Sequence, residues 1–390
     1  MIPPTLVNNS TWTAPVILEL CLLIGEPLIL WGMDGEGKTN RIEATCRAMD
    51  SLCLTIILGN QDPTDLGGLP VVVTHPETGE THVVRVPAKP FYIARERAKE
   101  GKKTTLFFDE MNQTAPLTIA AAQNILSSFC AGDVVLDRRY VSMVAAANPP
   151  GIATGARNFK PPVCTRMIHI EWELPLREYI EGERSGWPDP TPIQLPAGWE
   201  EENQAYAKSL TTGFLEKSGE PFFRQDSNEA QQNWSRPTPR TWSRARRAIA
   251  ALKSIDAKDG LWRGCLLGIL GSGPLQALLD YRKLLGMVSP ADVLADPKNV
   301  EIPESRDLTW VLCSALATQV REIYTWDAYN AAAEFYARIP QDRRDCCANS
   351  AISLAKDTPD WTRNTVVSPE WAQWANLGRA FHSVGKKSGE

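Results

Sequence analysis

Residues 32–39 read GMDGEGKT, which has the spacing G-x-x-x-x-G-K-T. This spacing is typical of a loop that binds the phosphates of a nucleotide. Its glycines let the backbone curl so that successive N–H groups point inward, and the following helix adds a partial positive charge. Lys38 supplies a cation for the terminal phosphates, and Thr39 a hydroxyl for Mg²⁺. The predicted nucleotide-binding residues are Gly32, Gly35, Glu36, Gly37, Lys38, Thr39 and Asn40.

Two adjacent carboxylates, Asp109 and Glu110, end a β-prone run that begins at Thr104. A parallel strand beside the first would deliver both to the edge of the sheet that carries the phosphate loop. Asp109 is then the predicted metal ligand together with Thr39, and Glu110 is the predicted catalytic residue that orients or deprotonates an attacking water.

The elements that must position these groups follow from the apolar pattern. Residues 13–24 have helical spacing, and residues 27–31 and 51–58 are predicted strands, the latter a buried one. Residues 71–86 are typical of a β-hairpin around a turn that contains glycine. Residues 140–147 form another predicted buried strand, which ends at Asn148.

The predicted fold class is α/β, a three-layer core with a parallel sheet followed by helices. We expect a nucleotide-binding core over residues 1–175, with the hairpin inserted at 71–86, because β-branched runs stop after Pro175. A helical region over 176–310, with a proline-rich insertion at 187–198, and a helical extension over 311–390 complete the predicted domains.

Composition excludes several classes of protein. The 390 residues are 43% hydrophobic and 22% charged, with a net charge of -5, which is unfavourable for a dedicated nucleic-acid binder. No apolar run is long enough to predict a membrane span, and the N-terminus lacks the basic start of a signal peptide. The nine cysteines show no C-x-x-C pair, so reduced thiols and a cytoplasmic location are expected.

The combination of motifs resembles the AAA+ ATPases, and within them the MoxR branch related to the dynein-type domains, over residues 15–310. The phosphate loop corresponds to Walker A and residues 106–110 to Walker B. Residues 109–116, DEMNQTAP, are similar to the MoxR pattern after Walker B, and residues 65–68, DLGG, resemble the segment after the second strand. The hairpin lies where this group inserts one into its second helix.

The resemblance implies further site residues. Asn148 corresponds to sensor 1, which helps to position the attacking water. Arg166 lies where the family has an arginine finger for the nucleotide of the neighbouring subunit, with Arg157 as a nearby competitor. Arg240 resembles sensor 2, an arginine that reaches the γ-phosphate in the same subunit. It belongs to an arginine cluster at 236–247 that could instead be a basic helix face for a polyanion, although a solvated face is the usual explanation of such runs.

The resemblance therefore implies ATP and Mg²⁺ as cofactors, and a ring-forming, hexameric homo-oligomer with protein-remodelling or chaperone-like activity. A partner with a von Willebrand factor A domain is a further expectation. Two alternatives stay open: a nucleic-acid-dependent motor, and a nucleotide-gated scaffold with little hydrolysis. Arg85 is the strong cation of the hairpin, which disfavours the motor. Asp34 and Glu36 place acids in the phosphate loop, which suggests the scaffold.

Overall fold

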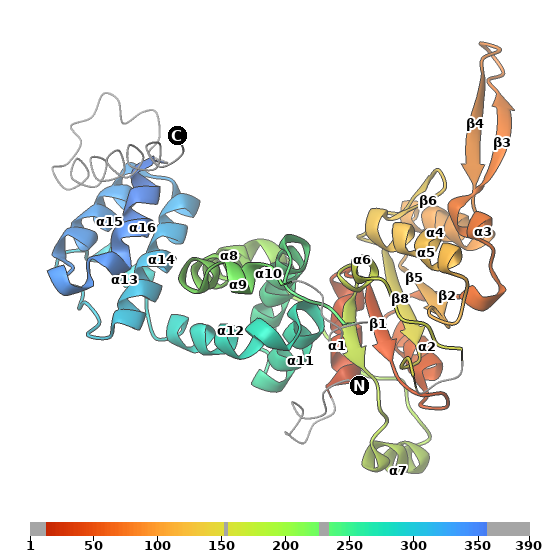
Figure 1. The fold of residues 1–390 in the computed structure, drawn as a ribbon, viewed down its shortest axis with the longest axis horizontal. Coiled ribbons are helices and arrows are strands. Elements are labelled where there is room, and N and C mark those ends of the chain that lie inside the picture. The colour runs from red at the N-terminus through yellow and green to blue at the C-terminus, as the bar shows by residue number, and fades with distance from the viewer. Residues whose placement is uncertain (1–12, 152–154, 226–233, 357–390) are drawn as a thin grey trace. The chain divides into compact units, whose positions relative to one another are not determined.

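The computed structural model describes residues 13–151, 155–225 and 234–356. The chain divides into two compact units (Figure 1), the first spanning Met1–Glu200 and Pro221–Leu275, the second Glu201–Glu220 and Gln276–Glu390. The domain boundaries expected at residues 175 and 310 stay predictions. Among the described helices, none is both long and apolar enough to cross a membrane.

A five-stranded sheet forms the centre of the first unit, in the order β2-β5-β8-β1-β9. All of its neighbouring strands run parallel. The strand that leads into the phosphate loop, β1, therefore lies between β8 and β9. The strands are β1 (Leu28–Trp31), β2 (Leu52–Ile57), β5 (Thr104–Asp109), β8 (Val141–Ala147) and β9 (Ile168–Glu171).

Helices cover both faces of this sheet because its central strands bury alternate side chains on opposite sides. One face carries Ile29, Phe108 and Ala145, which belong to the same buried cluster as side chains of α4 (Lys89–Lys99) and α5 (Pro116–Ser128). Helix α1 (Ala14–Leu23) contacts the sheet at β8 and β9, and α11 (Asp259–Leu270) contacts β9. The predicted α/β class, with a parallel sheet between helical layers and further helices after it, is confirmed.

The other described elements of the first unit connect or follow these strands. They are α1 (Ala14–Leu23), α2 (Lys38–Ala48), η1 (Leu58–Asn60), α3 (Pro63–Gly67), β3 (Leu69–Thr74), β4 (Thr81–Val86), α4 (Lys89–Lys99), α5 (Pro116–Ser128), β6 (Cys130–Ala131), β7 (Val134–Val135), α6 (Pro161–Cys164), α7 (Leu176–Ser185), α9 (Glu220–Phe223), α10 (Pro239–Ser254) and α11 (Asp259–Leu270). The sequence patterns gave no separate indication of α7.

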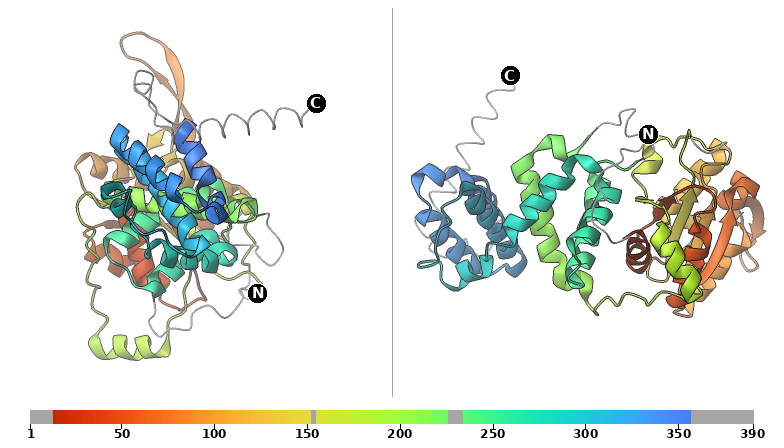
Figure 2. Two further views of the ribbon diagram at one scale, coloured as in Figure 1. Left: turned by 90° about the vertical axis from the view of Figure 1, so that its left-hand side faces the viewer. Right: turned by 90° about the horizontal axis from the view of Figure 1, so that it is seen from below.

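One strand differs from its expected burial. The apolar run at 51–58 indicated a buried strand, but β2 is at the edge of the sheet, and Leu52 and Ile57 are 37% and 42% exposed. An apolar run records β propensity, whereas burial depends on which strands pair on either side. The predicted hairpin is present as β3 and β4, which pair antiparallel. Both β3 and β4 are largely exposed, and the hairpin projects from the unit (Figure 2).

The second unit is helical around its own core. Its buried cluster includes Leu312, Tyr329, Phe335 and Leu354, and Tyr336 donates from its buried hydroxyl to the carbonyl of Cys313 at 3.0 Å. Its elements are α8 (Trp199–Ser218), which begins in the first unit, α12 (Ser272–Leu285), which does so too, α13 (Pro290–Ala295), α14 (Arg306–Ile323), α15 (Trp326–Arg338), η3 (Gln341–Arg343) and α16 (Asp345–Lys356). The helical group expected over 327–379 is described only as far as residue 356.

Helix α10 is joined to the segment before β1 by a buried ion pair. Glu26, 6% exposed, accepts from Arg244 at 3.2 Å, and Arg247 lies 3.7 Å from the same carboxylate. Burial lowers the pKa of Arg244 to about 10, although the charge of Glu26 opposes this effect. The pair therefore fixes α10 against the amino end of β1.

We expect Glu26→Ala to lower the free energy of unfolding by about 3–5 kcal/mol, because it leaves the Arg244 guanidinium buried without its counter-ion. Glu200→Ala is the matched control, since Glu200 pairs with Arg247 at 3.3 Å but is 44% exposed. Its loss should cost less than about 1 kcal/mol. Urea unfolding of both variants tests this, and equal destabilisation would contradict the importance of the buried pair.

Candidate phosphate-binding site

The phosphate loop joins β1 to α2, as the motif predicted. Gly35 and Gly37 have φ values of 82° and 73°, in the left-handed region that favours glycine, and Gly37 caps the N-terminus of α2. Gly32 is needed for a different reason, because a Cβ there would lie 2.4 Å from the carbonyl oxygen of Trp172. The loop needs its glycines because the turn requires positive φ at two positions and a close approach to Trp172, directly after β9, at a third.

Lys38 lies within the loop and joins it to the end of β8. Its ammonium donates to the carbonyls of Gly32 at 2.7 Å and Met33 at 2.8 Å, and to Oδ1 of Asn148 at 3.2 Å. Burial lowers the pKa of Lys38, and the charges of Asp34, Asp109 and Glu36 counteract this. An ammonium has three N–H donors, so a phosphate oxygen must replace at least one of these partners.

Both acids of the loop have hydrogen-bond partners in the protein. Oε2 of Glu36 accepts from the backbone N–H of Leu174 at 2.8 Å, and the carbonyl of Glu36 accepts from the Trp172 indole at 2.9 Å. Oδ1 of Asp34 accepts from the Asn148 side chain at 2.7 Å. Glu36 therefore ties the loop to the segment after β9, whereas the charge of Asp34 remains beside Lys38.

The predicted metal ligands lie together at the carboxyl edge of the sheet. Oγ1 of Thr39 is 3.4 Å from Oδ2 of Asp109. A hydroxyl and a carboxylate fit Mg²⁺, which takes one or two protein oxygens and fills its other positions with water and phosphate. The described residues hold no group of three or more His, Cys, Asp or Glu side chains that could hold a metal ion.

Glu110 follows directly in an uncommon backbone conformation. Its φ is 52°, and its N–H donates to Oδ1 of Asp109 at 2.9 Å. Its carboxylate lies over Gly59, where an added Cβ would be 3.2 Å from Oε2. A non-glycine residue with positive φ at the end of a sheet strand costs free energy, and such residues cluster at functional sites.

Asn148 is held at the edge of the sheet by Asn112, a residue that the motif analysis did not single out. The Asn112 side chain donates to the carbonyl of Asn148 at 2.7 Å and accepts from its N–H at 3.2 Å. Asn112 is fully buried and also donates to the carbonyl of Arg157 at 3.3 Å. The run at 109–116 contains Asn112, so its place after the two acids was the available signal.

The structure does not bring Arg166 and Arg240 to the phosphate loop. Arg240 donates to Oγ1 of Thr165 at 3.2 Å, next to Arg166. This turn precedes β9, whose first N–H bonds to the carbonyl of Pro27 at 2.8 Å, before β1 begins. Since the loop follows the carboxyl ends of the parallel strands, the two arginines lie at the amino edge. The expected role of Arg240 on the γ-phosphate of its own subunit stays a prediction.

The two arginines form a positive cluster. Burial and the charge of Arg240 lower the pKa of Arg166, and the Nε atom of Arg166 is buried with no hydrogen-bond partner among the described residues. Its guanidinium does donate to the carbonyl of Pro162 at 2.9 Å. By contrast, Arg157 is exposed in the loop after Asn148, and its N–H donates to the carbonyl of Asn112 at 2.9 Å. Arg157 therefore lies nearer the carboxyl edge than Arg166.

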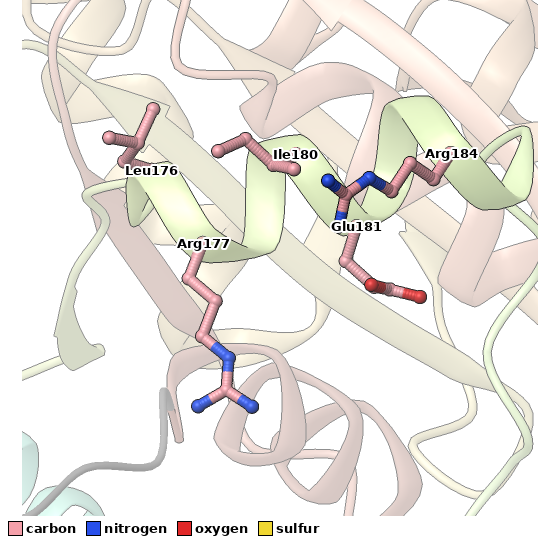
Figure 3. Close-up of a pocket in the computed structure, with 5 residues that line it drawn as sticks. All are labelled: Leu176, Arg177, Ile180, Glu181 and Arg184. Atoms are coloured by element: carbon pink, nitrogen blue, oxygen red, sulfur yellow. The ribbon is translucent and has the colours of Figure 1, made fainter.

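Two further features, Asn40 and a hollow on α7, lie outside the group of residues described above. Asn40 lies on α2, and the residue is exposed. The hollow is lined by residues of one helix, Leu176, Arg177, Ile180, Glu181 and Arg184 (Figure 3). None of these belongs to the phosphate loop, so this hollow is not the candidate nucleotide site.

Comparisons with known proteins give similarity to solved structures. No family model matches the sequence, and no curated protein matches it. An inferred ATPase from Cytophaga hutchinsonii is 16% identical, with 66% of this chain and 79% of that chain covered and a TM-score of 0.41. A full-length MCM homolog from Methanopyrus kandleri is 16% identical, with 66% of this chain covered and a TM-score of 0.32. This chain spans 55% of the length of the MCM homolog.

Proposed function

We propose that this chain is an AAA+ ATPase that hydrolyses Mg-ATP. The observation that carries the proposal is the convergence of Lys38, Thr39, Asp109 and Asn148 at one edge of the sheet. These residues come from three strand ends that are far apart in sequence. A cation, a hydroxyl, a carboxylate and an amide are the groups that phosphoryl transfer from a nucleotide requires.

In this proposal each group has one task. Backbone N–H groups of residues 32–37 and the N-terminus of α2 hold the phosphates. Lys38 neutralises the terminal phosphates, and Thr39 with Asp109 holds Mg²⁺, which withdraws charge from the phosphate oxygens when bound. Glu110 orients or deprotonates the attacking water, and Asn148 holds that water or the γ-phosphate.

The active assembly is a homo-oligomer, which we propose to be a hexameric ring with nucleotide between subunits. Arg166 and Arg240 support this, because both lie at the amino edge and neither has an ion-pair partner among the described residues. From there they serve the nucleotide of a neighbouring subunit. A MoxR-type remodelling or chaperone-like activity, a von Willebrand factor A-domain partner and a cytoplasmic location remain proposals that rest on the sequence resemblance.

Two other functions would give different results. A nucleotide-gated scaffold is favoured by the charge of Asp34 beside Lys38, and it would bind ATP with little turnover. A nucleic-acid-dependent motor is disfavoured because the tip of the exposed hairpin carries Glu77 and Glu80. Stimulation of turnover by DNA or RNA would favour the motor.

Glu110→Gln should lower kcat for ATP by about 10²–10⁴-fold, because the water loses its base, while ATP affinity is retained. Phosphate release and binding of a fluorescent ATP analogue measure the two quantities. Glu100→Gln, at an exposed residue that pairs with Lys102, is the matched control. Equal, slow turnover by wild type and Glu110→Gln would instead support the scaffold.

Arg166→Ala should lower kcat by about 10³–10⁵-fold in the assembled protein, since a guanidinium on the transferred phosphoryl group is worth that much. Arg240→Ala should also lower kcat. Arg157→Ala tests whether Arg157 is instead the arginine that acts on the nucleotide of the neighbouring subunit. Mixing Arg166→Ala subunits with Lys38→Ala subunits should restore part of the activity, because each supplies the half-site that the other lacks. Full loss in Arg157→Ala with an active Arg166→Ala would reverse the assignment.

Asp34→Asn should tighten ATP binding about tenfold at low salt. Removing a charge roughly 10 Å from a phosphate charge relieves about 1.5 kcal/mol of repulsion at an effective dielectric constant of about 20. The new amide can still bond to Asn148 through its oxygen. Binding titrations at two salt concentrations check this, and an unchanged Kd at both would show that Asp34 does not face the phosphates.

A further inference from the structure

We propose that His169 is a positioning residue that links the phosphate loop to the turn carrying Arg166 within each subunit. The link is a chain of two buried hydrogen bonds. Trp31 donates from Nε1 to Nδ1 of His169 at 2.9 Å, and Nε2 of His169 bonds to the carbonyl of Cys164 at 2.8 Å. The inference rests on the proposed function, and it adds a route by which nucleotide in one site affects the site next to it.

The chemistry of the partners fixes the direction of both hydrogen bonds. An indole N–H only donates, so Nδ1 of His169 must be the acceptor. A backbone carbonyl only accepts, so the ring proton lies on Nε2 and points at Cys164. His169 and Trp31 are 1% and 3% exposed, which leaves water no access to replace either bond. Losing one partner therefore strands a buried polar group.

At one end, the link begins at the phosphate loop itself. Trp31 is the last residue of β1, and the next residue, Gly32, starts the loop. The carbonyl of Trp31 accepts from the N–H of Trp172 at 2.6 Å, and the Trp172 indole bonds to the carbonyl of Glu36. A change in the loop on binding phosphate thus acts directly on the backbone that carries the Trp31 indole.

At the other end, the link reaches the turn that carries Arg166. Cys164 is the last residue of α6, two positions before Arg166. The N–H of Arg166 bonds to the carbonyl of Val163 at 3.0 Å, and its guanidinium bonds to the carbonyl of Pro162. Arg166 is bonded to carbonyls of α6, and His169 is bonded to the last carbonyl of the same helix. A shift of that carbonyl therefore moves Arg166.

Packing around His169 keeps the link stiff. Helix α11 comes so close at Gly268 that a Cβ there would lie 2.2 Å from the His169 carbonyl oxygen. The ring of Trp234 lies 5.2 Å from the His169 ring, and Phe159 lies 5.3 Å from Trp31. A displacement of the Trp31 indole is therefore passed to Cys164 instead of being absorbed by rotation of the imidazole.

Trp31→Phe tests the link, since it removes the N–H and keeps an aromatic ring against Phe159. We expect kcat to fall by between about tenfold and a hundredfold, because Arg166 is misplaced. ATP affinity should change less than about twofold, and the Hill coefficient for ATP should move toward unity. His169→Gln, whose amide offers both an acceptor and a donor, should keep most of the wild-type kcat and Hill coefficient, whereas His169→Leu should lose them. Trp234→Phe is the matched control, because it contacts His169 outside the link.

Hydrogen exchange of residues 161–167 gives a readout that does not need turnover. ATP binding should change the exchange of this segment in wild type and in Trp234→Phe, but not in Trp31→Phe. A Trp31→Phe protein that is less stable yet keeps the wild-type kcat, Hill coefficient and exchange response would overturn the link. A wild-type protein that binds ATP without hydrolysing it would refute the proposed function alone, and the exchange response would still decide the link. Absence of ATP binding would overturn both.

Discussion

Asn148 makes the hydrogen bonds on which the carboxyl edge of the sheet depends. Its side chain accepts from Lys38 and donates to Asp34, so one amide holds both the cation and an acid of the phosphate loop. Its backbone is held in turn by the buried Asn112. Because β8 lies between β1 and β5, this one residue is also the neighbour of the strand that ends in Asp109. The geometry of the site thus follows from the order of three parallel strands.

The amino edge of the same sheet carries two arginines, Arg166 and Arg240. Two like-charged arginines lie side by side there, and the nearby Glu26 pairs with Arg244 and Arg247 instead. Clustered guanidinium groups favour an anion, and the chain's own phosphate site is at the other edge. In the proposed function a single chain carries two half-sites at opposite edges of the sheet, and assembly brings each to its complement. The buried hydrogen bonds of His169 are the connection that we propose between these half-sites.

Much of the core was predictable because its signals are local. The loop motif requires glycine at turns with positive φ, and the apolar runs at 104–108 and 140–147 form strands as they indicated, although β8 and not β5 lies beside β1. The exposure of β2 was not predictable, since it depends on strand order. The contact of Arg240 with Thr165 was not predictable either, because a motif gives the residue type, whereas the packing of α10 against Glu26 decides where the side chain lies. His169 bonds to Trp31 and Asn112 bonds to Asn148, which are far apart in sequence, and no local pattern marks such pairs.

The central claim is that one nucleotide is held by residues of two subunits. It is tested most directly by a cryo-electron microscopy structure of the Glu110→Gln protein with Mg-ATP. The account predicts a closed ring in which each γ-phosphate lies between Lys38 of one subunit and Arg166 or Arg240 of the next. ATP bound to a protein that remains a monomer, or a ring in which neither arginine approaches a phosphate, would contradict it.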